Sequence, residues 1–323
     1  MLKISGLKKN FGEKEVLKGL DLTVPEHSIY GFCGRNGAGK TTTMKIVLGL
    51  LAADEGEILV SGEKVHFGDT PTNRYIGYLP DVPEFYSYMN AREYLRFCGQ
   101  ITGLSSKEIK DRSDELLDKV GLGKEKHRIK GYSRGMKQRL GIAQALLSRP
   151  KLLICDEPTS ALDPVGRKDI LDILSSVKDE TTVLFSTHIL SDVERICTDI
   201  AFLSEGTIKL SGKMEEIREQ NRTSNYHVSH DGMTAEVAEK LVKRFGDAVF
   251  INRIEEKSTD AAGEKISKNA VTEIGSSREF IFDTTKGDYT ELVYFIADNK
   301  IKVNKMELIE PSLEDIFLEV TGE

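Results

Sequence analysis

Long apolar runs are missing from this sequence of 323 residues. Its longest stretch without Asp, Glu, Lys or Arg is the 11 residues from Thr181 to Ser191, whereas a membrane-spanning helix needs about 20 apolar residues. The first residues, Met1 to Gly6, do not lead into the apolar segment of a secretory signal. We therefore expect a chain that does not cross a membrane.

An excess of positive charge is also lacking. The chain has 45 Lys and Arg against 52 Asp and Glu, a formal net charge of −7. Because proteins that act on nucleic acids attract phosphates with a basic surface, nucleic acid is disfavoured as the main partner. The four cysteines show neither metal-ligand nor redox spacing: Cys33, Cys98, Cys155 and Cys197. Each is expected to pack as a small buried side chain in a reducing compartment.

Short β-rich runs alternate with helical patterns from Leu2 to about Gly212, which is typical of an α/β domain around a mostly parallel sheet. A more helical section interrupts them at about residues 86–147. From about Asn221 the order of strands and helices suggests a small α+β domain. Within it, the tract from Glu255 to Arg278 is too poor in apolar residues to pack unaided, so a mobile loop or an exposed insertion is expected there.

A glycine-rich turn stands between an expected buried strand, Ser28 to Cys33, and an expected helix, Thr42 to Leu51. The turn matches the phosphate-binding pattern Gly-x4-Gly-Lys-Ser/Thr. Its glycines let successive backbone N–H groups point at a phosphate, Lys40 reaches the β and γ oxygens, and the Thr41 hydroxyl can ligate Mg²⁺. The predicted phosphate-binding residues are Gly34, Arg35, Asn36, Gly37, Ala38, Gly39, Lys40, Thr41 and Thr42.

An apolar strand from Leu152 to Cys155 ends in two acids, Asp156 and Glu157. A magnesium-binding carboxylate is expected at such a strand end beside a phosphate loop. Asp156 is expected to hold Mg²⁺ through water, and Glu157 to polarise the attacking water. Alone, two acids after an apolar strand are as often a plain strand end. The phosphate loop favours the functional interpretation.

The run from Tyr132 to Met136 stands 23 residues before the Asp156 motif, counted from Ser133. With the motifs above, it resembles the signature Leu-Ser-Gly-Gly-Gln of ATP-binding cassette (ABC) transporter nucleotide-binding subunits. Ser133 and Gly135 are kept, whereas Arg134 and Met136 replace a Gly and the Gln. The resemblance implies that Ser133 and Gly135, at a helix start, bind the γ-phosphate of an ATP held by a second subunit.

The resemblance assigns further positions. Ser160 to Asp163 resembles the loop that bridges the two ATP sites of a cassette dimer. His188 falls at the switch histidine, which contacts the γ-phosphate and supports the attacking water. Phe11 resembles the aromatic residue that stacks on adenine, with a core or hairpin phenylalanine as the alternative. Asp81 replaces a glutamine that touches Mg²⁺, so it is expected to meet the metal directly or through water.

Four aromatic residues cluster just beyond Asp81: Phe85, Tyr86, Tyr88 and Tyr94. A core stripe is one interpretation. The other follows from the resemblance, because in ABC proteins this region accepts the coupling helix of the transmembrane subunit. Aromatic side chains with polar tips suit both positions.

The resemblance covers residues 1–215, and the end of the chain resembles the C-terminal extension of bacterial type-2 exporter ATPases. It implies an α/β fold: a P-loop NTPase of the ABC type with a mixed sheet and a helical subdomain at about 86–147, followed by an α+β accessory domain at 216–323. The implied function is that of an ATPase subunit. It would dimerise around ATP and Mg²⁺ and drive export through a separate transmembrane permease at the cytoplasmic face of the membrane.

Two other functions stay open. One is an ABC ATPase acting on ribosomes or DNA, although such proteins tend to carry two cassettes or a long coiled-coil insertion, and neither is visible. The other is a nucleotide-gated scaffold with little hydrolysis, suggested by Asp81 and the altered signature. The two acids, Asp156 and Glu157, argue against the scaffold.

Overall fold

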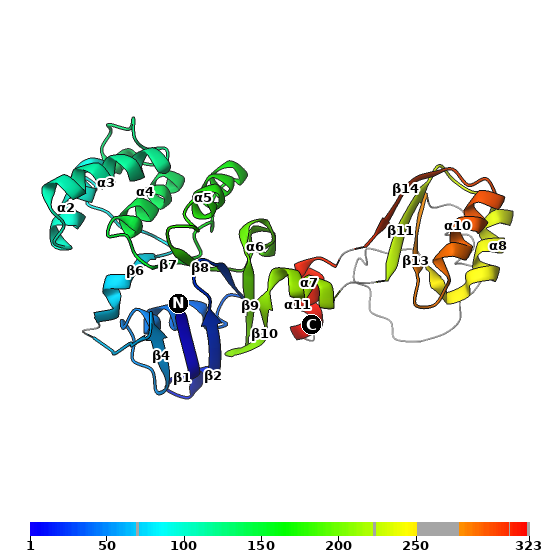
Figure 1. The fold of residues 1–323 in the computed structure, drawn as a ribbon, viewed down its shortest axis with the longest axis horizontal. Helices are drawn as coiled ribbons and strands as arrows, with labels where there is room; N and C mark the ends of the chain where they lie inside the picture. Colours follow the sequence, from blue (N-terminus) through cyan, green and yellow to red (C-terminus); the bar gives the residue numbers. More distant parts are fainter. Residues whose placement is uncertain (69–70, 222–223, 251–277, 310, 322–323) are drawn as a thin grey trace. The chain divides into compact units, whose positions relative to one another are not determined.

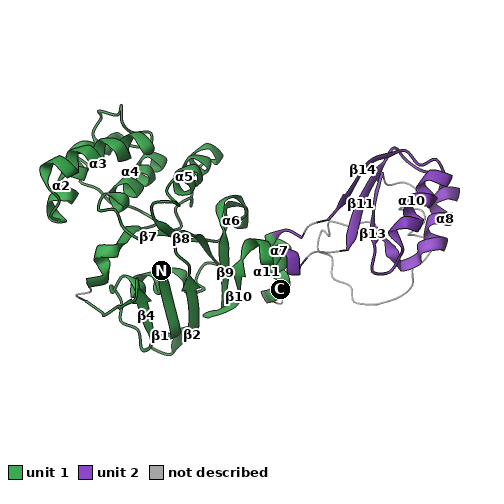
Figure 2. Cartoon of the chain, viewed as in Figure 1, with its two compact units in different colours: residues 1–217, 313–323 green, residues 218–312 purple. Residues whose placement is uncertain are grey.

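The computed structural model divides into two compact units, traced in Figure 1 and coloured separately in Figure 2. Unit 1 comprises residues 1–217 and 313–323, and unit 2 comprises residues 218–312. The residues that the structure describes are 1–68, 71–221, 224–250, 278–309 and 311–321. The polar tract expected at 255–278 lies outside these ranges except for Arg278.

The first sheet of unit 1 is antiparallel, in the order β2-β1-β4-β5. Its strands are β1 (Leu2–Phe11), β2 (Lys14–Val24), β4 (Glu55–Val60) and β5 (Glu63–Lys64). Along β2, Leu20, Leu22 and Val24 are buried and alternate with exposed polar residues. This period of two places one face of the sheet against a core.

The second sheet of unit 1 has the order β10-β9-β3-β8-β7-β6. Neighbouring strands from β9 to β6 are parallel, and β10 pairs antiparallel with β9. The bounds are β3 (Ile29–Cys33), β6 (Ile76–Leu79), β7 (Leu152–Asp156), β8 (Thr182–Thr187), β9 (Asp199–Ser204) and β10 (Thr207–Lys213). Every residue of β3, β7 and β8 is buried, as expected for parallel strands covered on both faces.

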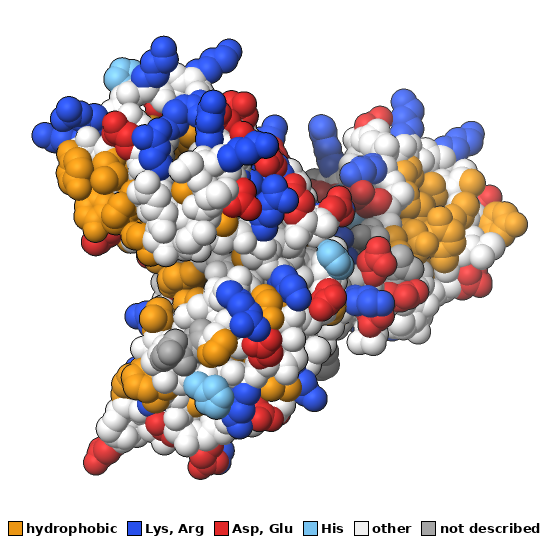
Figure 3. Space-filling view, turned by 60° about the vertical axis from the view of Figure 1, so that its left-hand side comes forward, with side chains coloured by type: hydrophobic (Ala, Val, Ile, Leu, Met, Phe, Trp, Pro, Cys, Tyr) orange, Lys and Arg blue, Asp and Glu red, His pale blue; other side chains and the backbone are white. Residues whose placement is uncertain are grey.

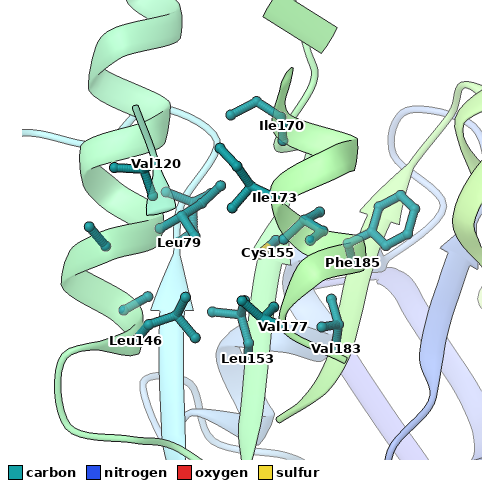
Figure 4. Close-up of a cluster of buried hydrophobic side chains, with 14 of the residues drawn as sticks. Leu79, Val120, Leu146, Leu153, Cys155, Ile170, Ile173, Val177, Val183 and Phe185 are labelled. Atoms are coloured by element: carbon teal, nitrogen blue, oxygen red, sulfur yellow. The ribbon is translucent and has the colours of Figure 1, made fainter. Parts of the chain in front are cut away.

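The two faces of this parallel sheet contribute to two cores. Leu153, Cys155, Val183 and Phe185 face the core shown in Figure 4, where they meet helix residues such as Ile173. The alternate strand residues, including Leu152, Ile154 and Leu184, face the core that is shared with the first sheet. Burial raises the pKa of the Cys33 and Cys155 thiols, which fits their predicted packing role.

Six α-helices lie between the strands in the described residues of unit 1, and α7 follows β10. The helical section expected at 86–147 consists of α2, α3 and α4, and capping boxes start α2 at Asn90 and α3 at Ser105. The bounds are α1 (Lys40–Val47), α2 (Ala91–Ile101), α3 (Ser106–Lys119), α4 (Arg134–Leu146), α5 (Pro164–Ser176), α6 (Leu190–Ile196) and α7 (Met214–Gln220). Within the described ranges, no helix has both the length and the apolar character to cross a membrane.

The described part of unit 2 has an antiparallel sheet in the order β12-β13-β11-β14 with two α-helices. Its elements are β11 (Asn225–His230), α8 (Ala235–Phe245), β12 (Val249–Phe250), β13 (Glu279–Asp283), α10 (Tyr289–Asp298) and β14 (Val303–Leu308). Phe280 and Phe282 of the sheet share a core with Leu241 of α8 and Leu292 of α10. This is the α+β architecture expected after the first domain.

The last helix, α11 (Leu313–Thr321), belongs to unit 1 rather than to the accessory domain expected at 216–323. Leu313 and Ile316 are buried in the core of unit 1, and the Phe317 ring meets the Phe202 ring edge-on at 5.2 Å. The Leu313 N–H donates to Glu194 Oε1 at 2.9 Å. Since Phe202 and Glu194 lie on β9 and α6, the chain returns to the first unit after unit 2.

Candidate functional site

A pocket of about 430 Å³ lies where parallel strands of unit 1 end. Strand β3 leads into the glycine-rich turn, β7 ends at Asp156, and His188 follows β8. The predicted residues that line the pocket are Asn36, Gly37, Gly39, Lys40, Thr41, Thr42, Asp81, Glu157 and His188. Ser160, from the loop expected to bridge two ATP sites, also lines it. The parallel sheet therefore gathers four separate chain segments into one pocket.

The glycine-rich turn forms an open backbone cradle. Gly37 and Gly39 have φ values of 85° and 114°, a region that side chains disfavour. A Cβ atom on Gly34 would lie 2.4 Å from the Leu203 carbonyl oxygen, so that position also requires glycine. Helix α1 has no side-chain cap at its start. Its first N–H groups are thus available to an anion, as the phosphate-binding prediction requires.

Lys40 is buried at the base of the cradle, with 5% of its side chain exposed. Its Nζ donates to the Gly34 and Arg35 carbonyl oxygens at 2.6 and 3.2 Å. The same Nζ lies 3.2 Å from Glu157 Oε1. The ammonium group is therefore held beside the carboxylate that was predicted to activate water.

The Glu157 carboxylate contacts both Lys40 and His188. Its Oε2 lies 2.9 Å from His188 Nδ1, while its buried Oε1 is at ion-pair distance from Lys40 without forming an aligned hydrogen bond. Glu157 has φ 47°, a strained value for a residue with a side chain. The Ser186 hydroxyl accepts the Glu157 N–H at 3.0 Å and fixes this turn. Because the buried Oε1 accepts no hydrogen bond from the described residues, it is suited to accept a proton.

Asp156, the last residue of β7, does not itself line the pocket but precedes the lining residue Glu157, and it is 3% exposed. Its Oδ1 accepts the Ser186 hydroxyl at 2.7 Å. Ser186 was not predicted from the sequence, although it stands opposite Asp156 in the parallel register of β7 and β8. Among the described residues no group of three or more His, Cys, Asp or Glu could hold a metal ion. The donors present, one buried carboxylate and the Thr41 hydroxyl, fit Mg²⁺ that takes its other ligands from phosphates and water.

Asp81 lines the pocket but is already engaged by the signature region. Its Oδ1 lies 3.3 Å from Arg134 Nη2, and its carbonyl oxygen accepts a hydrogen bond from Gln138 Nε2 at 2.6 Å. Both partners are on α4. The turn after β6 is therefore tied to the start of the signature helix, a link that the sequence did not predict.

Ser133, Gly135 and Phe11 do not line the pocket. Ser133 caps α4 by accepting the Met136 N–H at 3.2 Å. A Cβ atom on Gly135 would have Leu162 Cδ2 at 3.9 Å as its nearest neighbour, so this surface is open. Phe11 is half exposed at the end of β1, with Lys9 Nζ 5.5 Å from its ring centroid.

A buried acid connects the bridging loop to α6. Asp192 accepts hydrogen bonds from the Thr159 hydroxyl and Arg167 Nη2, each at 2.7 Å. Because Thr159 precedes Ser160 and α6 follows His188, this contact fixes two walls of the pocket to each other. Asp192 and Arg167 were missed by sequence reasoning, since no local motif marks them.

The aromatic cluster divides between the two interpretations. Tyr94 is buried and Phe85 packs against it edge-on, with ring centroids 5.0 Å apart. Tyr86 and Tyr88 are 48% and 62% exposed. The Tyr86 ring also packs against the Phe97 ring of α2, with ring centroids 5.4 Å apart. Half of the cluster is therefore core, and half is a tyrosine surface next to α2.

Comparisons with known proteins identify the family to which the chain belongs. A family model described as ABC transporter matches residues 17–160. The uncharacterized ABC transporter ATP-binding protein YxlF of Bacillus subtilis is 38% identical over 321 residues, 99% of each chain. The bacitracin transport ATP-binding protein BcrA of Bacillus licheniformis is 33% identical over 325 residues, 100% of this chain and 97% of its own. The dimeric structure of MJ0796, a bacterial ABC transporter cassette, has a TM-score of 0.59 and 26% identity, covering 66% of this chain and 99% of that one.

The similarity to YxlF and BcrA extends over both units, whereas the cassette structure corresponds to about two thirds of the chain. The predicted cassette fold, with its mixed sheet and helices, is confirmed. A ribosome- or DNA-directed ATPase and a scaffold are not favoured. The chain belongs to the ABC ATPase family, as an ATP-binding subunit of ABC transporters.

Proposed function

We propose that this subunit forms a homodimer around two Mg²⁺-bound ATP molecules and powers export by a separate permease. The observation that carries the proposal is the contact of Glu157 with both Lys40 and His188 in one pocket. These three groups come from three segments and suit phosphate binding and water activation at the same place.

Different residues are proposed to bind the phosphates, the Mg²⁺ ion and the adenine of ATP. Backbone N–H groups between Gly34 and Thr42 hold the β-phosphate, except those of Gly34 and Ala38, which already donate to the Thr187 and Arg35 carbonyl oxygens. Lys40 neutralises the γ-phosphate. Thr41 and Asp156 would hold Mg²⁺, with Asp81 as a further candidate ligand once Arg134 releases it. When bound, Mg²⁺ supplies charge neutralisation on the β and γ oxygens. Phe11 is proposed to stack on adenine at the edge of the site.

Hydrolysis then follows from the position of Glu157. A water oxygen forms a bond to the γ-phosphorus, while the bond from that phosphorus to the β–γ bridging oxygen breaks. The water proton passes to the Glu157 carboxylate, and ADP and inorganic phosphate leave. His188 holds Glu157 through its 2.9 Å contact and is placed to contact the γ-phosphate.

The second half of each site is proposed to come from the other subunit. Ser133 and Gly135 lie at the start of α4 outside their own pocket, with open space at Gly135. A partner's γ-phosphate there would meet the first N–H groups of a helix. The dimer of MJ0796 supports this arrangement, and a homodimer is the simplest one because this chain carries both halves.

The permease is proposed to bind at the exposed tyrosines of the helical section. Tyr86 and Tyr88 present ring surface with polar tips beside buried Tyr94, a composition that suits protein interfaces. BcrA, which is similar to this chain over 97% of its own length, is a bacitracin transport ATP-binding protein. Export as the direction, and the cytoplasmic face of the membrane as the location, rest on the resemblance to type-2 exporter ATPases.

The substitution Glu157→Gln tests the proposal. It removes the proton acceptor and keeps the shape, so ATP binding should persist while hydrolysis falls by about 100-fold or more. The variant should also accumulate as an ATP-dependent dimer in size-exclusion chromatography. Glu15→Gln, at an exposed site on β2, is the matched control and should behave as wild type. Wild-type turnover in the Glu157 variant would rule out the assigned chemistry.

A further inference from the structure

The helical section is positively charged although the chain as a whole is negative. Residues 86–147 contain 13 Lys and Arg and 7 Asp and Glu, a net charge of +6, whereas the chain carries −7. Figure 3 shows Lys and Arg side chains gathered over the upper part of unit 1, beside a hydrophobic patch. A local field of this sign attracts anions to this part of the surface.

A groove of about 520 Å³ lies between α2 and α3 in this section. On each helix the lining residues are mainly four positions apart, so they share a face. Gly99 allows a close approach to Ile109, because a Cβ atom there would lie 2.6 Å from Ile109 Cγ1. The polar residues along the groove are Arg92, Arg96, Gln100, Ser106, Lys110, Ser113 and Asp114.

The positive charges in the groove are only partly neutralised. Arg92 pairs with Asp114 and donates to the Gly123 carbonyl oxygen at 3.1 Å, which fixes its position. Arg96 and Lys110 make no ion pair with any residue that the structure describes. Two cations on facing helices are therefore available to an external anion.

The buried Ser113 hydroxyl lacks a hydrogen-bond acceptor, which is an observation independent of the charges. It is 5% exposed, lines the groove, and its hydroxyl has no hydrogen-bond partner in the described part of the chain. A buried serine inside a helix can donate to a carbonyl one turn earlier, and Ser113 does not. Burying an unpaired hydroxyl lowers stability, and a ligand oxygen would satisfy this group.

We propose that this groove binds the phosphate group of an anionic phospholipid. Arg96 offers a planar guanidinium, Lys110 an ammonium group, and Ser113 a hydroxyl donor, which together match phosphate oxygens. Ile101, at the end of α2, is 69% exposed. Cations next to an exposed apolar side chain are typical of a membrane interface. The groove is separate from the nucleotide pocket, so its occupancy does not depend on the proposed hydrolysis.

Vesicle binding tests the groove. The purified full chain is mixed with vesicles of phosphatidylglycerol and phosphatidylcholine, or of phosphatidylcholine alone, and the bound fraction is measured by flotation. The double variant R96A/K110A should lose about tenfold or more in affinity for the anionic vesicles. K124A/K126A removes the same charge from exposed positions of the same section outside the groove, and should lose less than about threefold.

Ser113→Ala separates a built site from diffuse attraction, because it changes no charge. Removing an unpaired buried hydroxyl should leave the melting temperature unchanged or raise it. The same variant should bind anionic vesicles several-fold more weakly if the hydroxyl donates to the lipid phosphate. Unchanged vesicle binding would show diffuse electrostatic attraction without a built phosphate site and would overturn the proposal.

A second arm distinguishes lipid from free phosphate. Inorganic phosphate is titrated calorimetrically into Lys40→Ala protein, in which the phosphate loop is disabled, with and without R96A/K110A. If R96A/K110A weakens binding to anionic vesicles but does not change the binding of inorganic phosphate, the lipid headgroup is supported as the ligand. If R96A/K110A weakens the binding of inorganic phosphate but not the binding to anionic vesicles, the assignment to a lipid is overturned. If R96A/K110A binds vesicles as K124A/K126A does and leaves phosphate binding to Lys40→Ala protein unchanged, no phosphate site exists in the groove. ATP hydrolysis measured on the same variants reports separately on the proposed function.

Discussion

Arg134 Nη2 lies 3.3 Å from Asp81 Oδ1, so two of the positions at which this chain departs from the family pattern form an ion pair with each other. Arg134 opens the signature helix, and Asp81 lines the nucleotide pocket. Both side chains are nearly half exposed, and an exposed pair adds little to stability. Arg134 is thus the cation that pairs with Asp81 in this structure, and a Mg²⁺ ion that binds Asp81 would have to displace it.

Arg134→Gln should lower the Mg²⁺ concentration needed for half-maximal ATP hydrolysis, by about two- to fivefold. The substitution removes the guanidinium that competes for the Asp81 carboxylate and keeps a good helix former at the start of α4. Combining it with Asp81→Gln should abolish the effect, because the contested carboxylate is gone. Equal Mg²⁺ dependence in wild type and the single variant would show that the pair does not bear on the metal.

The return of α11 to unit 1 predicts a large stability cost for Leu313→Ala. Leu313 is fully buried in that core, so truncation should cost about 2–4 kcal/mol and lower the melting temperature of unit 1. Leu50→Ala, at a side chain that is 63% exposed in the same unit, is the matched control and should change little. Equal effects in calorimetry would contradict the packing of α11.

Unit 2 should lose stability as the pH falls below about 6.5. His230 Nδ1 accepts the Gly232 N–H at 3.0 Å, and burial lowers the His230 pKa from its ordinary value of 6.5. Because the unfolded chain then binds the proton more readily, this contribution is fully present above pH 6.5 and decreases as the pH falls toward the lower pKa of the folded state.

His230→Gln keeps a side chain that can accept the Gly232 N–H and removes the titration. The melting temperature of unit 2 should therefore fall less between about pH 7.5 and about pH 5 in this variant than in wild type. His66→Gln, at an exposed position of unit 1, is the control. The same decrease in all three proteins would exclude His230 as the cause.

Local motifs predicted the centre of the site, because its chemistry depends on neighbours in the sequence. The phosphate loop, Asp156, Glu157 and His188 each follow a recognisable strand, and parallel pairing brings the strand ends together. Ser186 could have been found by aligning β8 with β7, but that register is a tertiary property. Arg134 with Asp81, and Asp192 with Thr159, join segments 53 and 33 residues apart. No local pattern specifies such pairs.

The predicted end of the accessory domain, at residue 323, differs from the structure for a similar reason, because residues 313–323 belong to unit 1. The apolar positions of α11 predicted an amphipathic helix, and the helix forms. Which core buries Leu313 and Ile316 depends on long-range packing against Phe202 and α6 rather than on adjacency in the chain. Sequence order alone therefore assigned this helix to unit 2.

The central claim is that each ATP site is shared by two copies of this chain. Lys40→Ala disables the phosphate loop. Gly135→Asp puts a negative charge where a partner's γ-phosphate would bind, and its Cβ has open space while an acid in the first turn favours α4. Each variant alone should be inactive.

A one-to-one mixture of the two variants tests that claim most directly. Half of the dimers formed are mixed, and each mixed dimer has one site with both Lys40 and Gly135 intact. Hydrolysis should therefore recover to roughly a quarter of the wild-type rate if subunits exchange freely and sites act independently. A mixture that remains as inactive as its components would contradict the shared site.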